Sequence, residues 1–409
     1  MIRTAARRAR PGFTLVELMV AAAICVLIMA VLATAFQLGI DTMRQMKSTG
    51  DMMDQLRGAT TALQADLQAN HLLDANGQPV KLSSLRYDNV TVTNNGAKAT
   101  PPFTVNSWSP PQNGFFRIGS STISGTQHPD ADQLVNGTGI ATNHYLHFTS
   151  VLSGLTDDDY YAAAVPAGGK AFQSTAAELA YFLDPNPVGA TPGGTPLFRL
   201  IRRQRLAAVS DTDRRDRPWP QTFDLAVVSF RPTGGTPPFI LNTLADLTNP
   251  SNRMGLSVNY VPSGTPADAG FAPIASAARM GDDTLLSNVI SFEVQVAWTL
   301  STDPLLSPTN KVPTSSTLAT TFQPGSKTDT PFDTLPQVQA ANWTGTGLDG
   351  SFTYDSWSSQ LDWTTNFNPS TANANRPPLL IRVQAVQVRI RIWDPKFQNA
   401  RQATIVQAL

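Results

Sequence analysis

A single carboxylate, that of Glu17, lies within the long apolar run near the start of the chain. From Leu18 to Phe36 the run holds 19 residues without a charge. As a helix these residues measure about 28 Å, close to the roughly 30 Å hydrocarbon core of a bilayer. A charged side chain is costly inside a bilayer and usually pairs with an opposite charge there. The pattern predicts a membrane-spanning helix in which Glu17 either binds a partner or reaches the interface alone.

Basic residues precede this run. Residues 1–12, "MIRTAARRARPG", carry Arg3, Arg7, Arg8 and Arg10 and no acidic residue. A basic segment before an apolar stretch stays on the cytoplasmic side, so the chain beyond the helix is expected outside.

The helix is expected to continue beyond the membrane. A cleavable secretory signal, the alternative, has a shorter apolar core and then a break in the helix. No proline occurs between Pro11 and Pro79, and an apolar stripe continues at helical spacing through Met53, Leu56, Thr60, Leu63 and Leu67. We therefore predict one helix from Phe13 to about residue 70. Three glycines within it, Gly39, Gly50 and Gly58, indicate either points of bending or sites of close helix packing.

Composition excludes several classes of protein. Thirty basic residues balance thirty acidic ones, and a nucleic-acid-binding protein is expected to show a basic stripe instead. The one cysteine, Cys25, lies in the apolar run, so an intramolecular disulfide is excluded and the thiol is expected to act as a small hydrophobe.

The rest of the chain reads as a β-rich head with long loops. Alternating apolar residues predict strands at "ISFEVQVAW" (290–298) and "AVQVRIRIWD" (385–394), the second with a hairpin partner in "ATIVQAL" (403–409). Further strands are expected within 86–95, 114–122, 177–206 and 223–230. Loops rich in Pro, Gly and Thr separate them. The expected fold class is α+β, with a long N-terminal helix and a head of two antiparallel sheets.

No catalytic, metal or cofactor site emerges from the head. The acid runs at Asp157–Asp159 and at Asp282 and Asp283 lack the spacing of a calcium loop, which favours solvated turns or helix caps. His144 and His147 are three apart and would face opposite sides of a strand, which suits a metal poorly. We therefore expect no enzyme and no cofactor and assign no metal ligands, with calcium binding by the acid runs left as the alternative to turns.

"GFTLVELMVAAAI", Gly12 to Ile24, resembles the N-terminus of type IV prepilins and pseudopilins. The resemblance implies that a prepilin peptidase cleaves after Gly12 and that the new N-terminal residue, Phe13, is N-methylated. It also implies an assembly role for Glu17, the fifth residue of the mature chain. Cleavage leaves a positive amine on Phe13, with which Glu17 of a neighbouring subunit can pair in a filament.

The order of the predicted elements is similar to that of J-type minor pseudopilins of type II secretion and of PilW-like minor pilins. This resemblance implies a structural minor subunit of a type II secretion or type IV pilus machine, assembled near the filament tip. Its partners would be prepilin peptidase, other minor and major pilins or pseudopilins and inner-membrane lipid, with no nucleic acid. The alternatives are a pilus-associated adhesin that binds through the head loops, and a major shaft subunit.

The expected organisation has four parts. A basic leader occupies residues 1–12, the transmembrane half of the helix 13–40 and its periplasmic half 41–74, and the head follows at 75–409. The chain is expected in the inner membrane as a single-pass protein, with a cytoplasmic N-terminus and a periplasmic head, and in an extracellular pilus after assembly.

Overall fold

The computed structural model describes most of the helix and the strands of the head. The described residues are 14–84, 93–94, 97–98, 111–120, 141–156, 159–163, 172–184, 186–216, 227–232, 239–248, 252–253, 282–300, 353–356 and 381–409. The chain divides into two compact units, Met1–Asp54 and Gln55–Leu409.

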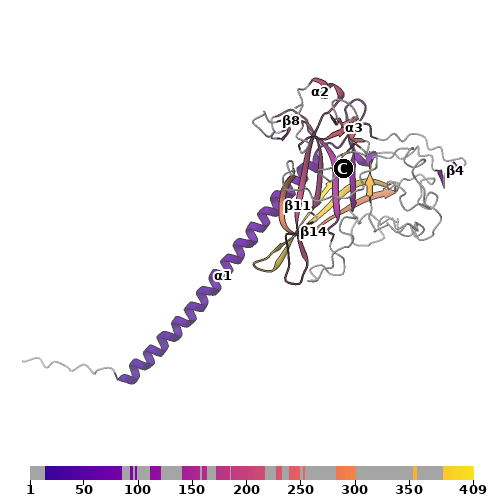
Figure 1. Cartoon of the computed structure of the whole chain (residues 1–409). Coiled ribbons are helices and arrows are strands. Elements are labelled where there is room, and N and C mark those ends of the chain that lie inside the picture. Colours follow the sequence, from indigo (N-terminus) through magenta and orange to yellow (C-terminus); the bar gives the residue numbers. More distant parts are fainter. Residues whose placement is uncertain are drawn as a thin grey trace, which may run out of the picture. The chain divides into compact units, whose positions relative to one another are not determined.

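Helix α1 runs without a break from Leu15 to Gln68 (Figure 1). Its 54 residues correspond to about 81 Å. The observed ends lie within about two residues of those predicted, at a level where assignments of helix ends themselves vary. A side chain added at Gly39, Gly50 or Gly58 would meet nothing within 4 Å, so no described residue of the chain packs closely on these glycines.

The last turns of α1 bury one stripe in the core of the second unit. Leu56, Ala59, Leu63 and Leu67 are each at most 3% exposed. Their spacing of three and four residues places them on one side of the helix, as predicted for Leu56, Leu63 and Leu67. Ala59 takes the buried position that was predicted for Thr60, which is half-buried. Met53, at the start of the predicted stripe, is half exposed instead.

Most strands of the head form one antiparallel nine-stranded sheet. Its strand order is β15 (Thr353–Asp355), β5 (Phe116–Ser120), β6 (His144–Val151), β9 (Ala176–Leu183), β11 (Pro196–Ala207), β14 (Asp282–Leu300), β16 (Ile381–Asp394) and β17 (Asn399–Ala408), with β10 (Gly189–Ala190) paired to β11. The fold class is confirmed: a long apolar helix precedes a β-rich head with antiparallel sheets.

Strand β14 changes its pairing partner halfway along. Its residues up to Val289 pair with β11, and those from Val289 onward pair with β16. Asn288, just before the change, has a positive φ of 56°, and the register shifts on both ladders nearby. Such irregularities bend a strand and increase its twist. The second half of β14 thereby approaches the start of β6, where the Phe292 amide donates to the Ala141 carbonyl at 2.9 Å.

Smaller elements complete the described part of the head. Four two-stranded ladders join β1 (Leu72–Leu73) to β2 (Pro79–Val80), β3 (Thr93–Asn94) to β4 (Ala97–Lys98), β7 (Tyr161–Ala163) to β8 (Phe172–Ser174) and β12 (Phe230–Pro232) to β13 (Phe239–Leu241). The short helices are η1 (Leu82–Ser84), α2 (Asp211–Asp216) and α3 (Leu244–Thr248). Of the strands predicted at 86–95 and 223–230, only the ends fall in described strands, and most of the remaining positions lie outside the described residues.

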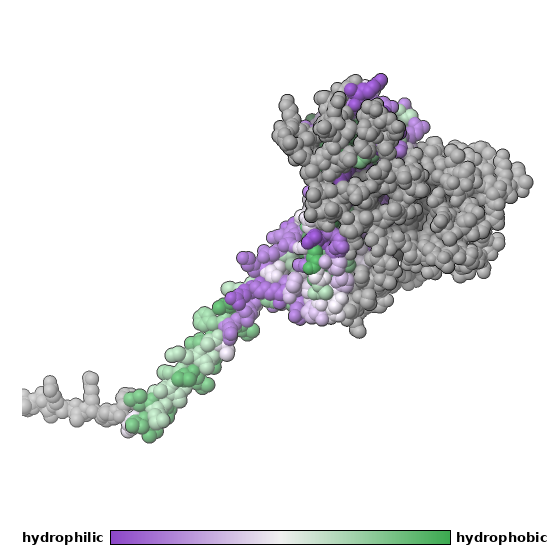
Figure 2. All heavy atoms as spheres, viewed as in Figure 1, coloured by the Kyte–Doolittle hydropathy of each residue, from purple (hydrophilic) through white to green (hydrophobic). Residues whose placement is uncertain are grey.

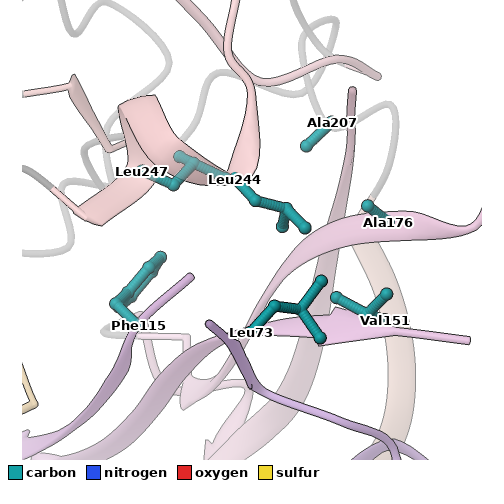
Figure 3. Close-up of a cluster of buried hydrophobic side chains, with 7 residues drawn as sticks. All are labelled: Leu73, Phe115, Val151, Ala176, Ala207, Leu244 and Leu247. Atoms are coloured by element: carbon teal, nitrogen blue, oxygen red, sulfur yellow. The ribbon is translucent and has the colours of Figure 1, made fainter. Parts of the chain in front are cut away.

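One apolar cluster joins α3 to the ends of several strands (Figure 3). Leu244 and Leu247 of α3 point toward the strand ends that carry the other members. The buried members of the cluster are Leu73, Phe115, Val151, Ala176, Ala207, Leu244 and Leu247. This packing attaches a five-residue helix, too short to be stable alone, to the sheet.

Candidate functional site

Glu17 lies in the first turn of α1, where it forms a capping box with Thr14. The backbone amide and the hydroxyl of Thr14 each donate to Oε2 of Glu17 at 2.9 Å. In return, the Glu17 amide donates to Oγ1 of Thr14 at 3.3 Å. A threonine followed three residues later by glutamate satisfies otherwise unpaired amide groups at a helix start. The structure thus assigns Glu17 a local bond within its own chain, which the sequence analysis missed although the spacing is visible in "TLVE".

The two predicted processing residues, Gly12 and Phe13, lie outside the described residues. Glu17 itself is exposed, and it is the only acidic or basic residue between Leu15 and Ile40. The apolar side chains that follow it along α1 are also exposed, including Met29 at 68% and Phe36 at 71%. Figure 2 shows this apolar surface on the first part of α1, and polar side chains over later turns. This helix is long and apolar enough to cross a membrane.

The Glu17 carboxylate is placed to accept a further hydrogen bond or to pair with a cation. A carboxylate in the first turn is favoured by the helix dipole and accepts hydrogen bonds readily. Both bonds from Thr14 go to Oε2. No described side chain donates to Oε1, so a second donor can bind there without breaking the cap.

The described histidines of the head, His71, His144 and His147, are buried, and they do not form a cluster of metal ligands. His144 accepts a hydrogen bond at Nδ1 from the Val294 amide, 3.1 Å away. His147 lies on the same strand and contacts Oε1 of Glu178 through Nε2 at 2.9 Å. Ser229 donates to the other oxygen of Glu178 at 2.5 Å. Among the described residues no hydrogen bond joins Ser229 to His147, and covalent catalysis needs such a bond between nucleophile and base.

We expect acid to destabilise the head through these histidines. Burial lowers the pKa of His71 and His147 below the ordinary value, and lowers the pKa of His144 to about 4. Below about pH 6.5 these histidines therefore bind protons in the unfolded chain but stay neutral in the folded head, so stability falls as the pH falls. For His144, whose folded pKa is about 4, the cost should approach about 1.4 kcal/mol per pH unit as the pH falls from about 6 to 5.

Thermal unfolding of the detergent-solubilised chain at several pH values in this window measures the effect. His144→Gln keeps an oxygen that can accept from Val294 but does not titrate, so its pH slope should fall by about one proton. An unchanged slope in this variant would contradict the assignment of His144 as a neutral buried group.

The predicted turns of acidic residues have different outcomes. Asp159 accepts from the Ser153 hydroxyl and from the Leu155 and Thr156 amides, as expected for a solvated turn, whereas Asp157 and Asp158 lie outside the described residues. The prediction of a turn or cap at Asp282 is wrong. Asp282 begins strand β14 and pairs with the buried Arg203 through two bonds of 2.7 and 2.8 Å. In the described part of the chain no three potential metal ligands come together.

A polar cluster that the sequence analysis missed attaches the end of α1 to the sheet. Asp66 receives two bonds from the Arg202 guanidinium, at 2.7 Å from Nε and 3.1 Å from Nη2, and one of 2.5 Å from the Tyr181 hydroxyl. Burial and the nearby Asp66 charge raise the pKa of Tyr181, which keeps this hydroxyl protonated and able to donate. The sequence does hold one indication of this cluster: the acidic Asp66 lies between Leu63 and Leu67 of the buried apolar stripe.

Comparisons with known proteins bear on the N-terminal segment alone. A model of the family described as "Prokaryotic N-terminal methylation motif" matches residues 7–33. Searches of curated proteins and of solved structures found no significant match. The match covers the second half of the predicted leader, Gly12, Phe13, Glu17 and much of the apolar run, so the chain carries a type IV pilin-type N-terminus.

Proposed function

We propose that this chain is a structural, non-enzymatic subunit, a minor pilin or pseudopilin, of a type II secretion or type IV pilus machine. The observation that carries the proposal is the N-terminal methylation motif at residues 7–33, which continues directly into the exposed apolar part of α1. The narrower similarity to J-type pseudopilins and PilW-like pilins comes from the order of elements in the sequence and remains part of the proposal.

Processing is proposed at the boundary between the leader and α1. Prepilin peptidase cleaves after Gly12, and the amine of Phe13 is methylated. The four arginines of the leader hold it on the cytoplasmic side, so the head lies in the periplasm while the chain waits in the inner membrane.

Assembly then uses Glu17 as a carboxylate that pairs with the Phe13 amine of a neighbouring subunit. Glu17→Gln tests this role, because Gln can replace Glu in a capping box while the charge is lost. We expect the variant to insert into the membrane and to be cleaved, but its incorporation into filaments should fall by about tenfold, as for the loss of one charge-assisted bond.

Asp41→Asn is the matched control for Glu17→Gln. It removes an acid that is also on α1 and that, among the described residues, pairs with the exposed Arg44 alone, 3.4 Å away. Exposed ion pairs contribute little, so Asp41→Asn should assemble normally. Equal incorporation of the two variants, measured against a major subunit, would argue against a special role of the Glu17 charge.

A position near the filament tip is proposed because the head is large. The second unit spans Gln55–Leu409, and such a head repeated at every subunit would crowd a shaft. We therefore expect only a few copies of this chain in each filament.

Quantitative mass spectrometry on sheared surface filaments, beside the membrane fraction, tests the proposal. A methylated Phe13 N-terminus at trace abundance relative to a major subunit is the expected result. A methylated start at near-stoichiometric abundance would make the chain a shaft subunit. A peptide that begins at Met1 in every fraction would overturn cleavage after Gly12.

A further inference from the structure

We propose that the outer edge of β17 binds an extended, acidic segment of a different subunit as an added antiparallel strand. The inference rests on the proposed function, because it requires the chain to assemble with other subunits. β17 is the last strand of the nine-stranded sheet, and among the described strands only β16 pairs with it.

The register shows which backbone groups point away from β16. The amide of Leu409 donates to the carbonyl of Gln384 at 3.0 Å, and this bond continues the ladder that pairs Ala408 with Ala385. In an antiparallel ladder, residues alternate between bonding the neighbour and pointing away from it. The even-numbered residues, such as Gln402, Thr404 and Val406, therefore direct their N–H and C=O groups outward.

Among the described residues, the edge carries one feature that can hinder strand addition, the charge of Arg401, but it has no bulge, proline or lysine. Ten consecutive residue pairs join β16 and β17 without a register shift, so no bulge twists the edge away. The strand "NARQATIVQA" holds no proline and no lysine, and Val406 is 52% exposed. A long, regular and partly apolar edge is a template for another strand, and proteins that recognise peptides by strand addition use such edges.

Charge identifies the chemistry of the added strand. The paired part of the hairpin, residues 385–408, carries four basic residues against the single acid Asp394, an excess of three; the basic residues are Arg389, Arg391, Lys396 and Arg401. Glu293 of the neighbouring β14 offsets one of them through its pair with Arg389, 3.6 Å away. A segment that carries Asp or Glu complements the remaining positive charge.

A second copy of β17 is a poor occupant. Symmetric antiparallel pairing of two β17 edges needs a two-fold axis perpendicular to the sheet, which reverses every direction within the sheet plane. It also brings two copies of the same basic hairpin side by side, and like charges at close range repel. The charge therefore favours a different, acidic subunit as the partner.

Proline at an outward position tests the backbone contact. Thr404→Pro removes one outward N–H group but leaves the bonds to β16, and edge strands tolerate proline at such positions. Thr404→Val, the matched control, keeps that N–H group with a side chain of similar shape. In the full-length chain, we expect incorporation of Thr404→Pro into filaments to fall by about tenfold relative to Thr404→Val. Equal incorporation of the two variants would overturn the proposal.

Photo-crosslinking identifies the occupant without a change to the backbone. A benzoylphenylalanine at Val406 is irradiated in cells that assemble filaments, and the crosslinked peptide is sequenced by mass spectrometry. A peptide from another subunit, with at least one Asp or Glu near the link, is expected. A peptide from this chain's own sequence, or no crosslink in assembled filaments, would overturn the proposal.

The two proposals fail in different ways. If the chain that carries Thr404→Val lacks a methylated Phe13 and is absent from filaments, the proposed function itself fails, and the strand-addition site fails with it. If that chain is processed and incorporated while Thr404→Pro behaves identically, only the strand-addition site is wrong.

Discussion

Replacing Asp66 by Ala is expected to lower the free energy of unfolding of the head by about 3–5 kcal/mol, the usual cost of removing one partner of a buried ion pair. Asp66 and Arg202 are 8% and 14% exposed at their side chains, and Arg202 lies in the strand next to that of Tyr181. Without the carboxylate, the guanidinium loses its buried counter-ion and keeps Gln204, at 2.8 Å, and the exposed Asp283, at 3.6 Å, while the Tyr181 hydroxyl loses its acceptor. Denaturant unfolding of the detergent-solubilised chain, followed by tryptophan fluorescence, measures the loss.

An apolar replacement of the whole cluster separates two quantities: the cost of leaving Arg202 without its buried counter-ion, and the net contribution of the ion pair to stability. The triple variant Asp66→Leu, Arg202→Met and Tyr181→Phe removes both buried charges and the tyrosine hydroxyl together, while the partly buried Gln204 loses one bond, so most of the stability should return. If the triple variant is as unstable as Asp66→Ala, the cluster contributes more than it costs to bury. In either case the cluster joins α1 to β9 and β11 through directional hydrogen bonds, which apolar packing does not provide. This favours a role in fixing how the end of α1 lies on the sheet.

Strands with one buried face could be predicted from the sequence. In β14 and β16, buried Phe292, Val294, Val386 and Val388 alternate with less buried or polar residues, so the period of two is visible in the letters. Helix α1 was equally visible, because its apolar run and its stripe contain no proline.

Strands buried on both faces could not be predicted in this way. All eight residues of β6 are buried, including His144, His147, Thr149 and Ser150, and no period of two remains in "HYLHFTSV". The polar members are accommodated by partners elsewhere in the chain, as when Thr149 donates to the His71 carbonyl at 2.6 Å. A sequence pattern does not contain these partners.

The same distinction applies to the candidate sites. The spacing of Gly12, Phe13 and Glu17 is local, so a motif of a few residues was enough to predict them. The pairs of Asp66 with Arg202 and of Arg203 with Asp282 join residues 136 and 79 positions apart. Asp282 was therefore misread as part of a turn, because its counter-ion becomes visible only once β11 and β14 lie side by side.

Gly114→Ala is the second change with a large expected effect. Gly114 precedes the buried Phe115 and has a φ of +88°, a conformation that alanine adopts only with strain. An added Cβ would lie 2.3 Å from the His71 carbonyl oxygen and 2.6 Å from Oγ1 of Thr149. Both atoms belong to the hydrogen bond that joins the residues after α1 to β6. Backbone strain and the steric clash together should cost about 3–5 kcal/mol.

Gly77→Ala separates these two contributions. Gly77 also has a positive φ, of 76°, but a Cβ there would meet nothing within 4 Å. It should therefore show the conformational cost alone, about 1–2 kcal/mol. Denaturant unfolding of both variants in the full-length chain gives the difference, which measures how closely Gly114 is held between His71 and Thr149. Equal losses of unfolding free energy in the two variants would mean that the segment at Gly114 moves aside. Its contact with His71, just after α1, would then be looser than the distances indicate.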